Sequence, residues 1–317
     1  TFLIEGEEEI GSPHIAQFVR ERALALAAQS DRPADGKGVK LTPLVRKISD
    51  QGVEYDFVKV AIDRHARTAT ITVSAPSTPQ PETIQAIEAA GVHWWPLQMA
   101  RELDDAILHL RTNEIDIGTW LLKTMGDANA VLACDAVLIA HQSHWLVRET
   151  MGLIRRTFAR IDVSSRSLFA LIDESSCFAG SLAELAFAAD RSYMLALPDA
   201  PESAPHLYLS EMNFGPLPMI TGQSRLSRRF YDDEAPLAAA RASIRQALDA
   251  DAAMALGLIT SNPDGKSEEK ECSYKGITRR EADANLYLMY EFILSDKNFK
   301  DVSLICDQTG EHVPIKY

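Results

Sequence analysis

The chain has 317 residues, enough for one large domain or two modest ones and for a sizeable buried core. Its formal net charge of -13 argues against a dedicated nucleic-acid-binding protein, because contacts with phosphates need a basic face. No apolar run is long enough to span a membrane, and no signal peptide is visible. These features predict a soluble protein of the cytoplasm.

The chain contains four cysteines, whose positions follow no metal-binding or disulfide pattern. They are Cys134, Cys177, Cys272 and Cys306. Zinc sites that can be recognised from sequence usually show two cysteines with two residues between them, and no such pair occurs here. We therefore expect no metal site and a reducing compartment.

Residues 1–20 are predicted to be a leader in which a short apolar run meets the acidic cluster Glu7-Glu8-Glu9. The cluster resembles the metal-site motif of the zinc aminoacylase and dipeptidase family. In that family the position of Glu8 is the general base and that of Glu9 a metal ligand. Carboxylates alone do not make a catalytic zinc site, which typically takes three protein ligands and one open position. An inert acidic leader is favoured, and a dipeptidase fragment is kept as an alternative.

The segment that follows changes character twice. Residues 21–52 are predicted to be a helix and a linker, with turn and breaker residues from position 30 to 36. Residues 55–62 and 68–73 alternate and are rich in β-branched side chains, which predicts a hairpin. Further predicted elements are a proline-rich loop at 76–81, helices at 82–90 and 96–111, a strand at 117–123 and a mainly helical region at 128–160.

Two motifs in this part could bind ligands or could serve packing. His141 and His144 could share a helix face and hold a metal, but no carboxylate lies at matching spacing. A polar packing role or a place on a dimer surface is favoured for them. Trp94 and Trp95 are expected in the core or an interface rather than in a stacking platform.

The stretch from residue 167 to 226 organises the chain. An apolar run at 168–172, a turn of small residues, a helix at 182–190 and a second apolar run at 193–197 predict a βαβ unit and a parallel sheet. The turn would let a ligand approach backbone N–H groups. Equally, Gly180 could serve only tight packing of helix on sheet.

The remaining residues give weaker patterns. Residues 206–211 look like the end of a strand that carries Glu211, and helices are predicted near 226, at 237–248 and at 251–256. After residue 264 lysines become frequent. A helix at 279–294 and a strand at 301–306 are predicted there, and residues 265–317 are left as an unassigned tail.

Several segments resemble the crotonase (enoyl-CoA hydratase/isomerase) superfamily. They include Gly180–Leu185, Ser210-Glu211 and Gly222–Leu226, together with longer agreement at 94–97, 100–107, 163–172 and 209–215. The resemblance spans about residues 22–264 and makes 53–264 the crotonase-like domain. It implies an α/β fold of the ββα spiral type with a mostly helical C-terminal region. Only the linker and the second module of longer, two-module members are matched.

The resemblance also implies a site. Glu184 and Glu211 would be the paired carboxylates that position water and move protons. The backbone N–H groups of Ser181 and Ala136 would form the oxyanion hole. Asp135 would place a carboxylate beside that hole, which opposes an oxyanion.

Gly180 and Gly215 would contact the substrate. The implied activity is that of a lyase or hydrolase of aerobic benzoyl-CoA breakdown, which opens the ring of 2,3-epoxybenzoyl-CoA with water to give 3,4-dehydroadipyl-CoA semialdehyde and formate. No cofactor is expected, since CoA is part of the substrate, and no nucleic-acid or membrane partner. A homo-oligomer is expected. The alternative is a non-catalytic crotonase-like module that serves as a dimerisation scaffold.

Overall fold

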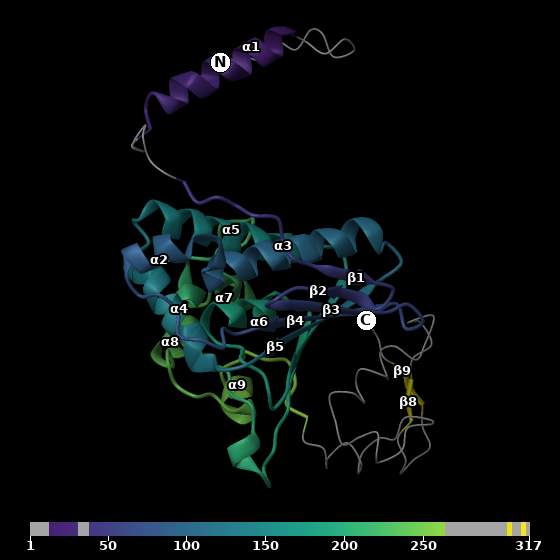
Figure 1. Cartoon of the computed structure of the whole chain (residues 1–317). Helices are drawn as coiled ribbons and strands as arrows, with labels where there is room; N and C mark the ends of the chain where they lie inside the picture. Colours follow the sequence, from purple (N-terminus) through teal and green to yellow (C-terminus); the bar gives the residue numbers. More distant parts are fainter. Residues whose placement is uncertain (1–12, 31–37, 264–302, 306–311, 315–317) are drawn as a thin grey trace. The chain divides into compact units, whose positions relative to one another are not determined.

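The computed structural model describes residues 13–30, 38–263, 303–305 and 312–314 (Figure 1). The chain divides into a unit of residues 1–40 and a unit of residues 41–317. The first unit contains the helix α1 (Pro13–Ala27). The helix predicted within residues 21–52 is therefore present, but it begins earlier, inside the predicted leader. Its alanine, leucine, arginine and glutamate residues favour a helix, although large apolar side chains such as Phe18 and Leu24 are exposed. The proposed domain boundaries stay predictions.

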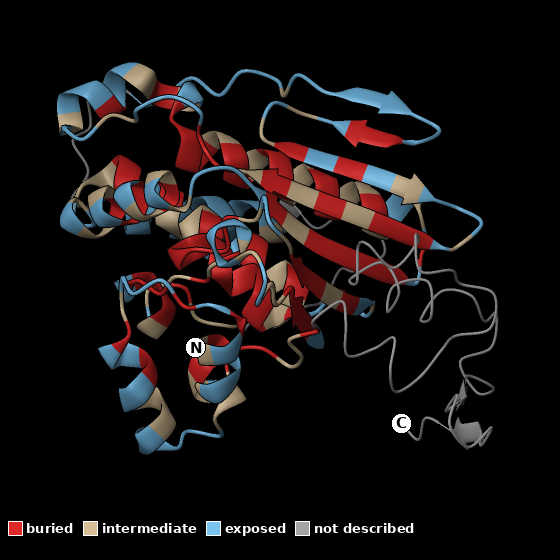
Figure 2. Cartoon of the chain, turned by 90° about the horizontal axis from the view of Figure 1, so that it is seen from below, coloured by how far each residue is buried: buried red, intermediate tan, exposed pale blue. Residues whose placement is uncertain are grey.

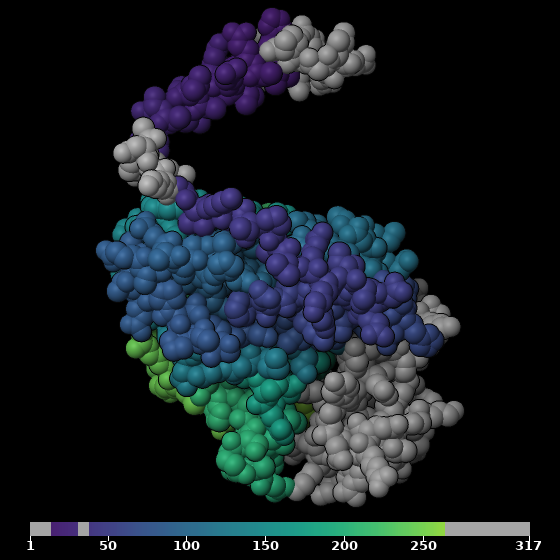
Figure 3. Space-filling model, in the orientation of Figure 1, coloured from purple at the N-terminus to yellow at the C-terminus, as the bar shows by residue number. Residues whose placement is uncertain are grey.

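The second unit is built on a sheet whose strands follow one another in chain order. They are β1 (Lys47–Ser49), β2 (Gly52–Glu54), β3 (Val58–Asp63), β4 (Thr68–Ser74), β5 (Thr119–Met125), β6 (Ser167–Ile172) and β7 (Arg191–Met194). The first four pair antiparallel and the last four pair parallel. The residues that lead into β1, together with β1 to β3, form a band across the face shown in Figure 3.

The predicted hairpin is confirmed as β3 and β4. Val58 lies opposite Val73 and Val60 opposite Ile71, so the buried aliphatic side chains of both strands share one face. The turn between them is closed by a hydrogen bond from the Ala66 N–H to the Asp63 carboxylate. Alternation of apolar and polar residues thus sets the register of this pair.

Parallel strands need crossover connections, and helices supply them here. The crossovers contain α2 (Ile84–Ala90), η1 (Gly91–His93), α3 (Trp95–Asn113), α4 (Ala128–Ala140), α5 (Trp145–Asp162), η2 (Gly180–Leu182) and α6 (Ala183–Ala188). The sequence β6-α6-β7 is the predicted βαβ unit, and its two strands are parallel. The α/β class is therefore confirmed.

The core lies where α3 and α5 pack on each other beside the sheet (Figures 1 and 2). Trp94 and Trp95 are each 1% exposed, which confirms their predicted place in the core. The indole N–H of Trp95 donates to the Ser74 carbonyl 3.0 Å away, so its polar atom is satisfied although the ring is buried. By contrast, β1 is exposed along its length.

The region predicted as mainly helical from 128 to 160 is two helices with a break. His141 ends α4 and His144 precedes α5, so the two histidines do not share a helix face. Each has its own partner: His141 Nε2 lies 3.0 Å from the Glu82 carbonyl, and His144 Nε2 lies 3.3 Å from Glu88 Oε1. These contacts agree with the polar packing role.

The end of the described domain is mostly helical, as expected. It contains η3 (Pro201–Ser203), η4 (Glu211–Phe214), α7 (Arg225–Arg229), α8 (Glu234–Ala242) and α9 (Ala250–Ala255). The predicted strand at 206–211 is reduced to isolated bridges, among them Ala179 to Tyr208, before η4 begins. The helix predicted at 237–248 is α8, which begins and ends earlier than predicted. It begins at Glu234 because the Asp233 side chain accepts a hydrogen bond from the N–H of Ala235.

Two short strands in the tail, β8 (Ser303–Ile305) and β9 (His312–Pro314), pair antiparallel. β8 falls within the predicted strand at 301–306. The leader with Glu8 and Glu9, and the predicted helix at 279–294, lie outside the described residues. In the part of the chain that is described, no helix combines the length and the apolar character needed to cross a membrane.

Candidate functional site

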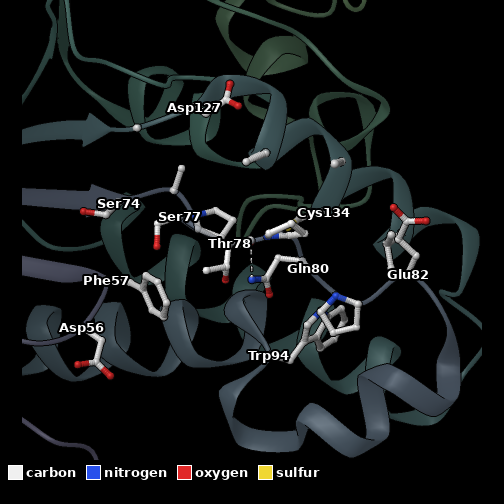
Figure 4. Close-up of a pocket in the computed structure, with 18 of the residues that line it drawn as sticks. Asp56, Phe57, Ser74, Ser77, Thr78, Gln80, Glu82, Trp94, Asp127 and Cys134 are labelled. Carbon is white, nitrogen blue, oxygen red and sulfur yellow. Dashed lines mark hydrogen bonds between the residues drawn. The ribbon is translucent and has the colours of Figure 1, made fainter.

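A pocket of about 640 Å³ opens at the carboxyl ends of the parallel strands β4 and β5 (Figure 4). One wall is the loop of residues 75–82 that follows β4, and the opposite wall is one face of α4 after β5. Such strand ends are where open α/β sheets bind ligands. A volume of this size can hold a small organic ligand.

Much of the pocket lining is apolar. Phe57, Trp94 and three prolines of the loop face Ala130, Ala133 and Val137 of α4 across the pocket. Burial raises the pKa of the Cys134 thiol to about 12, so this pocket residue is not a thiolate nucleophile at neutral pH. Asp56, Glu82 and Asp127 also line it, whereas the described residues of the lining include no arginine, lysine or histidine.

Two close contacts fix the mouth of the pocket. Gly126 has φ +123°, and a Cβ at this position would lie 2.9 Å from the Cβ of Ala75. Only glycine therefore allows the ends of β4 and β5 to approach this closely. Nearby, the buried carboxylate of Glu102 accepts hydrogen bonds from the N–H groups of Phe57 and Val58, at 2.7 and 3.1 Å, which holds Phe57 in place.

The far side of α4 carries a different arrangement. The Asp135 carboxylate accepts a hydrogen bond from the backbone N–H of Ser181 at 2.7 Å and another from the Ser210 hydroxyl at 3.0 Å. Asp135 and Ser181 are each 1% exposed. Burial raises the pKa of the Asp135 carboxyl to about 7, against the lowering effect of its hydrogen bonds. The amide that the sequence analysis assigned to an oxyanion hole is thus occupied by a side chain of the protein.

The other expected oxyanion donor, Ala136, lies in the interior of α4. Backbone N–H groups in a helix interior donate to the carbonyl four residues earlier. An oxyanion role for Ser181 and Ala136 would therefore require movement of Asp135 and of α4, and it stays a prediction.

Glu184 lies in a buried ion-pair network. Its carboxylate accepts from Arg225 Nη1 at 2.8 Å and from the Asn213 side-chain amide at 2.7 Å. Arg225 also makes a two-pronged pair with Asp162, at 3.0 and 2.7 Å. Burial raises the pKa of Glu184, while Arg225 and Asn213 oppose that rise.

Glu211, the second expected carboxylate, is placed differently. Its side chain is 60% exposed and lies 3.5 Å from Arg241, which stacks over the Phe214 ring. Gly215 follows η4 with φ +138° and open space where a Cβ would stand. Glu184 and Glu211 therefore lie in a buried and an exposed setting, and their paired role and that of Gly215 stay predictions.

Sequence reasoning did not single out Arg225 or Asp162, which hold Glu184, or Phe57, which lines the pocket. Arg225 is 63 residues from Asp162 and 41 from Glu184, so no local spacing could reveal these pairs. Among the described residues, His, Cys, Asp and Glu do not gather in a group of three or more able to hold a metal. That no metal or cofactor is needed stays a prediction.

No family model matches the chain. Solved structures with similarity to it include enoyl-CoA hydratases. That of Geobacillus kaustophilus is 14% identical with a TM-score of 0.47 and covers 82% of this chain and 80% of its own. That of Bacillus halodurans is 16% identical with a TM-score of 0.47 and covers 74% and 80%.

One curated relative is much more similar in sequence. The chain is 54% identical over 258 residues to benzoyl-CoA-dihydrodiol lyase of Aromatoleum evansii. This alignment covers 81% of the chain and 46% of the relative, so the chain spans about half the length of the lyase it matches. The chain is therefore homologous to that part of the lyase, in agreement with the similarity to lyases of benzoyl-CoA breakdown that the sequence implied.

Proposed function

We propose that the chain acts as part of a lyase on a benzoyl-derived acyl-CoA. The observation that carries this proposal is the 54% identity over 258 residues to benzoyl-CoA-dihydrodiol lyase. Because the chain corresponds to 46% of that relative, the proposal is that it supplies one half of the catalytic protein.

In this proposal the pocket beside α4 receives the acyl group. A six-membered ring derived from benzoate is apolar, and the half-buried Phe57 ring and the prolines of the loop offer it apolar surfaces. The three carboxylates of the lining would repel the phosphates of CoA, which therefore must lie outside it.

The proposed reaction opens the ring of 2,3-epoxybenzoyl-CoA. The acyl group takes up two water molecules, one carbon leaves as formate, and 3,4-dehydroadipyl-CoA semialdehyde remains. Glu184 and Glu211 are the proposed acid and base, Ser181 and Ala136 the proposed oxyanion donors, and Gly180 and Gly215 line the proposed substrate path. Because these residues are outside the lining of the pocket, the proposal requires α4 to move so that the acyl group can reach them. Paired carboxylates serve such proton transfers when their environments differ, and here Glu184 is buried whereas Glu211 is exposed.

A second candidate function is a non-catalytic module that supports a catalytic half. The contact of the Asp135 carboxylate with the Ser181 amide favours it, because that amide has no free proton to offer a substrate. A homo-oligomer in the cytoplasm, engaged in aromatic breakdown, is part of both proposals. Light scattering of the purified chain would measure the oligomer.

Calorimetric titration with benzoyl-CoA tests the first proposal. We expect micromolar binding by the parent chain. Binding by Ala133→Phe should be at least roughly tenfold weaker, because the phenylalanine ring would occupy space in the pocket. Ala238→Phe, on the exposed surface of α8 and outside the pocket lining, is the matched control and should bind like the parent. No heat from the parent would contradict an acyl-CoA site in this chain and leave the supporting module.

A further inference from the structure

One face of α3 is joined by hydrogen bonds to residues that line the pocket. Trp95, Gln98 and Glu102 are spaced by three and four residues, so they share one face of the helix. The Trp95 N–H donates to the Gln80 side chain at 3.1 Å. The Gln98 amide donates to the Asp56 carboxylate at 2.7 Å. Gln80 and Asp56 belong to the lining, whereas Gln98 and Glu102 do not, so α3 acts on the pocket from outside it.

Glu102 is a buried carboxylate that N–H donors hold without a cation. It is 1% exposed, and none of the ion pairs found among the described residues includes it. Its Oε2 atom accepts from the N–H groups of Phe57 and Val58 at 2.7 and 3.1 Å, and its Oε1 atom accepts from Gln98 Nε2 at 2.9 Å. Burying a carboxylate is costly, and an apolar side chain could pack α3 on the sheet at lower cost. The choice of glutamate therefore points to a need for these N–H contacts.

The contacts fix Phe57 at both polar groups of its backbone. Its N–H donates to Glu102, and its carbonyl accepts from the Ser74 N–H at 2.8 Å. The half-buried Phe57 side chain lines the pocket beside Asp56 (Figure 4). Because backbone dihedral angles limit the rotamers of a side chain, a fixed backbone narrows the directions in which the ring can point. Contacts between two aromatic rings depend on their mutual orientation, whereas a flexible chain adapts to either setting.

We propose that Glu102, assisted by Gln98, is a positioning residue that holds the Phe57 ring and thereby makes the pocket favour a ring-shaped acyl group over a straight chain. This inference rests on the proposed function, because it takes the pocket to be the acyl site. It adds a cause of selectivity that lies outside the pocket. Glu102 touches no ligand in this account and acts only through Phe57, while Gln98 joins it to Asp56.

The experiment is calorimetric titration of the full chain with benzoyl-CoA and with hexanoyl-CoA. The ratio of the two dissociation constants measures the preference for a ring. We expect the parent to prefer benzoyl-CoA and Glu102→Leu to lose roughly fivefold of that preference, mainly through weaker binding of benzoyl-CoA. Glu102→Gln should keep most of the preference, because its amide oxygen can still accept from the Phe57 N–H. Gln98→Leu should show a smaller loss than Glu102→Leu.

Asp105→Leu is the matched control on the same helix. The Asp105 carboxylate accepts from the Tyr55 hydroxyl at 2.7 Å and pairs with Arg46, and neither partner lines the pocket. This variant also removes a link from α3 to the chain around β2. It should lower the melting temperature without changing the ratio of the two dissociation constants, so a change of ratio separates positioning from a loss of stability.

A folded Glu102→Leu that keeps the parent's ratio would overturn the inference and leave the lyase proposal standing, since the parent would still bind benzoyl-CoA. A parent that binds neither thioester would contradict the proposed function, and the inference with it. If Glu102→Leu does not fold, Gln98→Leu decides, because the Gln98 side chain is only half-buried. A lowered preference in that variant supports the inference, and the parent's preference contradicts it.

Discussion

The two sides of α4 offer a ligand different things. On one side, alanine and valine side chains line a pocket of about 640 Å³ with an acidic edge. On the other side, Asp135 joins a dry polar cluster that includes a backbone amide and a hydroxyl. Space for a ligand and donors able to polarise one are therefore separated by the thickness of a helix.

This separation shows that a fold can contain a ligand-sized pocket and a group of hydrogen-bond donors without placing them next to each other. The pocket owes its existence to the strand ends and to Gly126, whereas the polar cluster is held by the Asp135 side chain of α4, backbone groups of η2 and side chains at the start of η4. Substitutions on one side should therefore leave the other side largely intact. The polar side, which carries the charged groups outside the pocket lining, is expected to respond as follows.

The largest effect is expected from Arg225→Met. The substitution keeps the bulk of the side chain but leaves Glu184 and Asp162 buried without their cation, which should cost about 3–5 kcal/mol of unfolding free energy. Urea unfolding measures this loss. Arg241→Met, which removes an exposed pair with Glu211, is the control and should cost at most about 1 kcal/mol. Equal losses of unfolding free energy in the two variants would contradict a stabilising role for the buried network.

A pH-dependent effect is expected from Asp135. Its folded-state pKa of about 7 lies above the ordinary value of 3.8, so the folded protein holds a proton that the unfolded chain has already released. The contribution of Asp135 to the free energy of unfolding should therefore be fully present below pH 4. It should be lost as pH rises toward 7, and the loss should be on the order of 4 kcal/mol at most. Glu184, whose charge also raises the pKa of Asp135, contributes to this fall.

Asp135→Asn sharpens this prediction, because the amide cannot ionise and keeps an oxygen for the two donors. The difference in unfolding free energy between variant and parent, measured by urea at pH 5 and pH 8, should shift in favour of the variant at pH 8. Parallel pH profiles for the two proteins would show that Asp135 is ionised throughout.

The smallest effect is expected from Glu211→Gln. Its carboxylate is 60% exposed, so the change should alter stability by roughly 0.5 kcal/mol or less. If the proposed function holds, any loss of acyl-CoA turnover by this variant would then report chemistry rather than folding. A large loss of stability in urea would instead show that η4 depends on this residue.

The elements that sequence predicts well are those whose pattern is local. The β3–β4 hairpin and the β6-α6-β7 unit follow from alternation and from apolar runs beside a small-residue turn. The break between α4 and α5 was missed, since residues on both sides of His141 and His144 favour a helix.

The site was less accessible to sequence reasoning. Glu184 and Glu211 look alike in the sequence, and only the long-range contact with Arg225 makes one of them part of a buried network. Asp135 was expected to oppose an oxyanion, but its hydrogen bond with the Ser181 amide depends on how α4 packs against η2. Such contacts join residues that lie 46 positions apart.

The close approach of Gly126 to Ala75 gives the pocket an adjustable dimension. A side chain at position 126 would meet Ala75 at 2.9 Å and force the ends of β4 and β5 apart. The loop after β4 and the start of α4 are the two walls of the pocket, so they would move with those strand ends. Gly126 itself belongs to the pocket lining, so residue size at this one position sets both the spacing of the two walls and the space beside them, and it is a handle for engineering which ligands the pocket admits.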